Sequence, residues 1–226
     1  MDYKREKRRN LLAFLVLLSL IIPTLLLILK LVIIREYDSN TVLMLVQCLL
    51  GIIAFFIPNI IYHKLKLELP PLIYVSYIVF LWSSIFLGEV RNFYYRYENW
   101  DNILHFFSGM MLGSLGFSII TLLNKNLKTI NLSPVFVMLF SISFAVSIGV
   151  VWEIYEFTFD GILNLNMQKF ALEDGTLLIG RNALEDTMKD LIIDFCGAGL
   201  MSVLGYLTLK KNKKWFKENL IIKKNL

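Results

Sequence analysis

Residues 134–157 read PVFVMLFSISFAVSIGVVWEIYEF, an apolar run that ends with two glutamates, Glu153 and Glu156. About 20 apolar residues are enough to cross the hydrocarbon core of a bilayer as an α-helix. Comparable runs occupy residues 11–34, 42–62, 69–88, 103–123 and 191–209. Because a helix satisfies its own backbone hydrogen bonds, these six runs predict an all-α fold, a polytopic membrane helical bundle with about six transmembrane helices.

The composition supports a membrane protein. Of the 226 residues, 57% are hydrophobic and only 18% are charged, whereas a soluble domain of this length carries more charge and shorter apolar runs. No repeat, low-complexity tract or domain boundary interrupts the pattern. We therefore expect residues 1–226 to form a single six-helix transmembrane domain.

The distribution of basic residues predicts the orientation. Lysines and arginines concentrate in two tails, residues 1–10 and 210–226, and basic loops and tails favour the cytoplasmic side. Both termini are therefore expected in the cytoplasm, in a protein of the cell membrane. The excess positive charge lies mainly in these tails, and the chain, with its net charge of +5, carries no nucleic-acid motif, so the expected partner is the lipid bilayer and not nucleic acid.

Acidic residues gather at the opposite, extracytoplasmic ends of the predicted helices. An ionisable group at the bilayer centre costs about 2.5–3.5 kcal/mol on insertion scales, so several together indicate a shared function. The groups at these helix ends are Glu89; Asp101 and His105; Glu153, Glu156 and Asp160; and Asp186, Asp190 and Asp194.

Helical spacing predicts that each set of acids lies on one helix face. At about 100° per residue, Asp101 and His105 are separated by roughly 40°. Asp186, Asp190 and Asp194 also step by roughly 40° each, and intramembrane charges usually face a bundle interior or a wet cavity. The three sets can therefore meet inside the bundle.

Crowded carboxylates repel one another, and protons, basic partners or a metal cation can relieve that repulsion. Carboxylates with one imidazole suit Mg²⁺, Mn²⁺ or Zn²⁺, so a divalent metal is the predicted cofactor. The expected catalytic set is Asp101, His105, Glu153, Glu156 and Asp190, with His105, Glu153, Glu156 and Asp190 as metal ligands. Around them we expect Glu89, Asp160, Arg181, Asp186 and Asp194, either supporting the ligands or contacting a substrate.

Three segments together resemble known motifs. Residues 101–109 (DNILHFFSG) resemble an Asp-x₃-His-Phe helix start, residues 152–157 (WEIYEF) a Trp-Glu-x₂-Glu-Phe helix end, and residues 186–198 (DTMKDLIIDFCGA) an Asp-Thr-Met-x-Asp-Leu … Gly-Ala helix. The combination resembles the YjdF-like multi-pass membrane proteins and, more distantly, the VanZ-like family, which usually has Asn where this chain has Asp194. The resemblance covers the motif-bearing half, residues 101–199. It implies a multi-pass membrane protein and supports the site residues, while the VanZ-like similarity implies a role in the cell envelope.

Three functions remain compatible with these residues. The first is a metal-dependent membrane enzyme that acts on a lipid or lipid-linked envelope precursor at the outer leaflet. The second is a transporter coupled to protons or cations, although no inverted repeat is visible. The third is a non-enzymatic envelope or structural factor in which the acids and their partners form a buried ion-pair network.

Overall fold

The computed structural model describes residues 3–35, 37–65, 67–69, 71–126, 132–172, 174–210 and 222–223. Two compact units make up the chain, a first unit that extends to Trp100 and a second unit, Asp101–Lys223. The prediction that residues 1–226 form a single six-helix domain concerns how these units associate, and it stays a prediction. Most of the predicted C-terminal basic tail, residues 211–221 and 224–226, lies outside the described residues.

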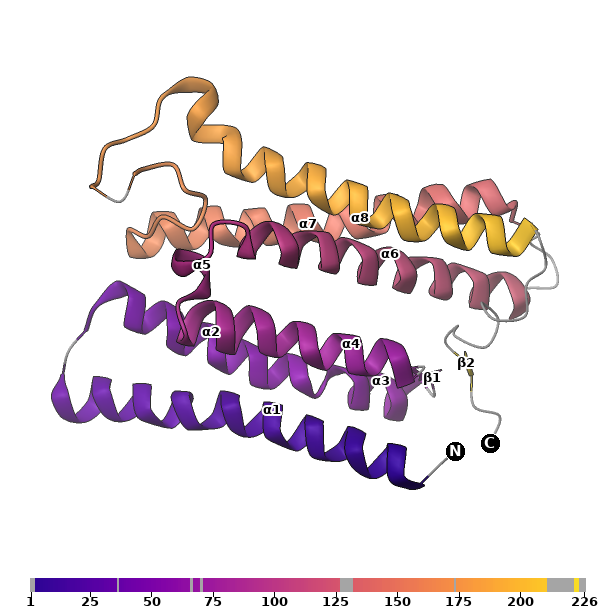
Figure 1. Cartoon of the computed structure of the whole chain (residues 1–226), viewed down its shortest axis with the longest axis horizontal. Coiled ribbons are helices and arrows are strands. Elements are labelled where there is room, and N and C mark those ends of the chain that lie inside the picture. Colours follow the sequence, from indigo (N-terminus) through magenta and orange to yellow (C-terminus); the bar gives the residue numbers. More distant parts are fainter. Residues whose placement is uncertain are drawn as a thin grey trace. The chain divides into compact units, whose positions relative to one another are not determined.

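The first unit contains three stretches of membrane-spanning length, coloured from indigo to magenta in Figure 1. Its elements are α1 (Tyr3–Leu29), the π-helix η1 (Lys30–Ile34), α2 (Ser39–Phe55), α3 (Ile57–Leu65), the two-residue strand β1 (Leu67–Glu68), α4 (Pro71–Leu81), the π-helix η2 (Trp82–Val90) and the short α5 (Phe93–Arg96). Helices α1, α2 and α4 contact one another.

Local sequence explains the interruptions and starts in this unit. Helix α1 continues through Pro23, whereas a break at Phe56 separates α2 from α3, two residues before Pro58. Pro58 has no N–H to donate to the carbonyl of Ala54 one turn earlier, and its ring would clash with that carbonyl in a continuous helix, which accounts for the break. Helix α2 begins after Asp38, whose side chain accepts the backbone N–H of Thr41 as an N-cap.

The second unit is built on three long helices that run side by side (Figure 1). They are α6 (Trp100–Asn126), α7 (Pro134–Leu163) and α8 (Glu185–Lys210), with the 3₁₀ helix η3 (Gly180–Leu184) before α8 and the strand β2 (Ile222–Lys223) after it. Ser133 caps α7 and Pro134 occupies its first turn, where a missing N–H is harmless. Asn164 ends α7 in the left-handed conformation, with φ 52°.

Glycines set how closely α6 approaches α8. A Cβ at Gly109 would collide with the backbone of Asp194, and one at Gly197 would collide with the backbone of Phe106. Small residues allow such close helix approach in membranes. Their contacts fix the rotation of α8 against α6 and so decide which side chains of α8 face α6.

Within the part of the chain that the structure describes, six stretches are long and apolar enough to span a membrane: residues 6–34, 39–64, 71–90, 100–120, 134–163 and 180–208. They correspond one to one with the predicted runs, so the all-α, multi-pass membrane fold is confirmed. Their ends differ from prediction because the acidic segments are also helical. Helix α7 extends to Leu163 and α8 begins at Glu185, which places Asp160 and Asp186 within helices.

Candidate functional site

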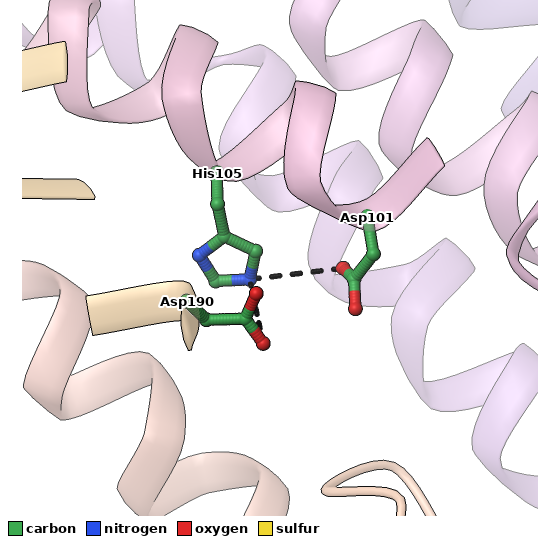
Figure 2. Close-up of side chains that lie close together, drawn as sticks. All are labelled: Asp101, His105 and Asp190. Atoms are coloured by element: carbon green, nitrogen blue, oxygen red, sulfur yellow. Dashed lines mark ion pairs between the residues drawn. The ribbon is translucent and has the colours of Figure 1, made fainter. Parts of the chain in front are cut away.

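His105 stands at the centre of the acidic cluster in the second unit. It comes from the second turn of α6, is only 8% exposed, and faces Asp101 of its own helix and Asp190 of α8 (Figure 2). Its Nε2 atom lies 3.7 Å from Asp101 Oδ1 and 3.9 Å from Asp190 Oδ2. The i, i+4 spacing of Asp101 and His105 therefore places both on one face, as the sequence predicts.

Asp101, His105 and Asp190 each offer one ligand atom, and these atoms all lie within 4.8 Å of one another. Tetrahedral ligands about 2.0–2.1 Å from a zinc ion are separated from each other by roughly 3.3 Å. The two separations from His105 Nε2, 3.7 and 3.9 Å, are larger than this, so the side chains would have to draw closer together to hold a metal. Of the predicted ligands, His105 and Asp190 belong to this group, and Asp101 takes the place expected for the glutamates.

Asp194 contacts the other ring nitrogen of the imidazole, Nδ1. Its Oδ2 lies 3.4 Å from His105 Nδ1, and its Oδ1 accepts a hydrogen bond of 3.0 Å from the Ser108 hydroxyl. Gly149 of α7 makes room for this carboxylate, because a Cβ there would meet Asp194 Oδ2. A carboxylate behind one ring nitrogen favours the tautomer that leaves the other nitrogen free for a metal. Asp194 thus orients the ring so that Nε2 faces Asp101 and Asp190.

Glu153 and Glu156 lie beside this group and not within it. Both are buried in α7, at 5% and 7% exposure. Glu156 Oε1 accepts from the indole N–H of Trp152 at 3.0 Å, and Glu153 Oε2 accepts from the Gln168 side chain at 3.3 Å. Glu156 remains within electrostatic range of His105 and Asp190. The structure thus places the two glutamates next to the group formed by Asp101, His105 and Asp190. Their predicted role as ligands stays a prediction.

Asp160 anchors the loop that follows α7. Its two carboxylate oxygens accept the backbone N–H groups of Met167 at 2.7 Å and of Gln168 at 3.0 Å. The Gln168 side chain then reaches Glu153 and, at 2.9 Å, the hydroxyl of Thr187 on α8. These bonds hold the loop across the end of the bundle where α7 ends and α8 begins.

Lys169, on the same loop, supplies a positive charge to the cluster. The sequence did not predict this residue as part of the site. Its ammonium lies 2.7 Å from Asp101 Oδ2 and 2.8 Å from Asp186 Oδ1. Although burial opposes the charged form, the two carboxylates outweigh it and raise the pKa of Lys169 above its ordinary value. The backbone of Lys169 is left-handed, with φ 47°, which is uncommon for a residue with a side chain.

One predicted residue of the second unit lies apart from these contacts. Arg181 is exposed in η3, and its electrostatic partner is Glu185 of α8. Glu89 lies at the end of η2 in the first unit, so its predicted role stays a prediction. No spacing signal in the sequence could have revealed Lys169 and Gln168, because both reach the site through the conformation of one loop. The hydroxyl of Thr187, on α8, joins the network through Gln168 of that loop.

Three buried carboxylate oxygens have no hydrogen-bond partner among the described residues: Asp190 Oδ1, Asp186 Oδ2 and Glu153 Oε1. Burying an unsatisfied charged group is costly, and Asp190 is only 1% exposed. Such atoms in a native protein call for a ligand, a proton or a bound water. The cluster therefore has unused capacity to hold a cation.

These features define a multi-pass α-helical membrane protein with a buried carboxylate–histidine cluster. The family described as "Predicted membrane protein (DUF2238)" matches residues 15–211, so the chain belongs to that family. The match agrees with the resemblance to YjdF-like proteins, while the more distant resemblance to the VanZ-like family stays a prediction.

A protein of Thermotoga maritima described as "Uncharacterized protein" is 34% identical over 139 residues, which cover 59% of this chain and 62% of that protein. The matched part thus spans less than two thirds of that relative. No solved structure matches the chain.

Proposed function

We propose that this protein is a divalent-metal-dependent membrane enzyme that acts on a lipid or lipid-linked envelope precursor at the outer leaflet. The observation that carries the proposal is the buried His105 imidazole, with Nε2 facing two carboxylates at 3.7 and 3.9 Å and Nδ1 held from behind by Asp194. Asp101, His105 and Asp190 would hold the ion. An imidazole in a mixed nitrogen and oxygen set favours Zn²⁺ or Mn²⁺ over Mg²⁺.

Neighbouring groups supply the other parts of a hydrolytic site. A bound divalent ion would lower the pKa of a coordinated water and polarise a phosphoryl or acyl oxygen. Glu153, with its unpartnered Oε1, is the residue we assign as general base. The site lies where α6 and α8 begin and α7 ends. The predicted orientation puts these helix ends at the outer headgroups, where an amphiphilic substrate presents its polar part.

Metal content tests the first part of the proposal. Protein purified in detergent should contain about one equivalent of transition metal by elemental analysis, or take it up in calorimetric titrations with Zn²⁺ and Mn²⁺. His105→Ala and Asp190→Asn should lose this binding. His63→Ala is the matched control, because His63 is the chain's other histidine and is exposed on α3. Equal metal uptake by the His105→Ala and His63→Ala proteins would contradict the assignment.

Turnover tests the second part and separates the enzyme from its alternatives. Reconstituted protein should release phosphate or an acyl product from lipid-linked substrates, and both chelator and Glu153→Gln should abolish that release. If proteoliposomes instead show pH- or cation-coupled uptake that Glu153→Gln abolishes, without any turnover, the protein is a transporter. If neither activity appears while Glu156→Gln alters stability or partner capture, the non-enzymatic role is favoured.

A further inference from the structure

Carboxylates outnumber basic side chains in the cluster, even when Lys169 is counted. Carboxylates of Asp101, Asp186, Asp190 and Asp194 surround His105 and Lys169 within one network of contacts. Among the described residues of this network, Lys169 is the only lysine or arginine, and its two carboxylate partners keep it charged at neutral pH. Asp190 is almost fully buried, and one of its oxygens has no hydrogen-bond partner in the described part of the chain.

Asp101 contacts both the ammonium of Lys169 and the imidazole of His105. Its Oδ2 binds Lys169 at 2.7 Å, while its Oδ1 faces His105 Nε2 at 3.7 Å. An ion held by Asp101, His105 and Asp190 would therefore share a carboxylate with the lysine. Two cations on one carboxylate repel each other, and partial burial strengthens that repulsion.

The loop holds the lysine in this place. Asp160 fixes the two preceding backbone amides, and Lys169 itself adopts an uncommon left-handed conformation. A left-handed backbone is unfavourable for a residue with a side chain and persists where surrounding contacts enforce it. Here those contacts bring the ammonium onto Asp101 and Asp186.

We propose that Lys169 is an internal cation that competes with the bound divalent ion through Asp101 and so determines the metal affinity of the site. The inference rests on the proposed metal binding. It assigns a specificity-determining role to a residue outside the ligand set: the lysine disfavours metal binding, so that its removal tightens binding rather than weakening it.

The test measures Zn²⁺ and Mn²⁺ affinity by calorimetry on the full chain in detergent. Lys169→Met should bind roughly tenfold tighter or more, because one positive charge beside the ion is removed. Lys169→Gly should do the same, since it also removes the charge and glycine accepts the left-handed backbone. Lys169→Arg should stay near wild type. Lys189→Met is the matched control, because Lys189 pairs with Glu185 on the exposed face of α8.

The outcomes separate this inference from the proposed function. Unchanged or weaker binding in Lys169→Met overturns the inference and leaves metal binding intact. Binding by Lys169→Met but not by the wild type supports the inference and overturns the proposal that the native protein uses the metal. Absence of binding in every variant overturns both. Tighter binding in Lys169→Met but not in Lys169→Gly would contradict the role of charge.

Discussion

Asp194 lies behind His105, with Oδ2 3.4 Å from Nδ1, and connects the imidazole to the Ser108 hydroxyl through its second oxygen. The pair joins α8 to α6 and sets the direction of Nε2. It also gives Asp194 a role that its place in the sequence does not reveal.

Asp194→Asn should weaken divalent metal binding about 10- to 100-fold, because an amide orients the imidazole less strongly and removes a nearby negative charge. Calorimetric titration of the purified variant measures the effect. Ser108→Ala is the control, since it removes the hydroxyl contacts with the far oxygen of Asp194 and with the backbone carbonyl of His105 but leaves the Asp194 carboxylate against the imidazole, and it should change the affinity much less. Wild-type affinity in Asp194→Asn would show that Asp194 does not orient the ligand.

Gly109→Val should destabilise the second unit by about 1–3 kcal/mol or more, since the added atoms meet the backbone of α8 rather than a movable side chain. The thermal unfolding temperature in detergent should fall clearly. Gly199→Ala is the control, because a Cβ at Gly199 meets nothing within 4 Å and alanine is the better helix former. A similar loss of stability in both variants would contradict the close contact of α6 with α8.

Asp160→Ala should release the loop that carries Lys169. Each lost hydrogen bond to the carboxylate is worth about 1.5–3 kcal/mol locally, so the amides of Met167 and Gln168 should exchange with deuterium much faster. Mass spectrometry of peptides from this loop measures the change. Asp174→Ala is the control, because it removes a comparable backbone contact, the N–H of Thr176 at 2.9 Å. Its effect should stay near the turn between Ala171 and Leu177, which form an antiparallel bridge.

Asp38, which caps the start of α2, should contribute to the stability of the fold in a pH-dependent way. Hydrogen bonds from the hydroxyl and N–H of Thr41 lower the pKa of Asp38 to about 2 from an ordinary 3.8. A depressed carboxyl pKa stabilises the fold above the unfolded value, and that stabilisation is lost as pH falls toward the folded value. The stability difference between wild type and Asp38→Ala should therefore shrink as the pH is lowered from 4 to 2. A difference that stays constant over this range would contradict the assigned cause.

The sequence alone determined the membrane fold and part of the cluster. Apolar run length is a local property, so the six spans could be predicted directly, and only their ends moved. The spacing of Asp101 and His105, and of Asp190 and Asp194, is also local, because one helix fixes the angles between its own side chains.

Only the tertiary structure decided which of these faces meet. The rotation of α8 against α6 depends on backbone contacts at Gly109 and Gly197, and helix spacing does not encode it. That rotation brings Asp190 and Asp194 to opposite sides of the His105 ring, while Glu153 and Glu156 lie beside the group. Lys169 enters from a loop whose left-handed backbone and Asp160 anchor depend on contacts between segments distant in sequence. The sequence therefore supplied the charges and their periodicity, and packing between helices decided which charges meet.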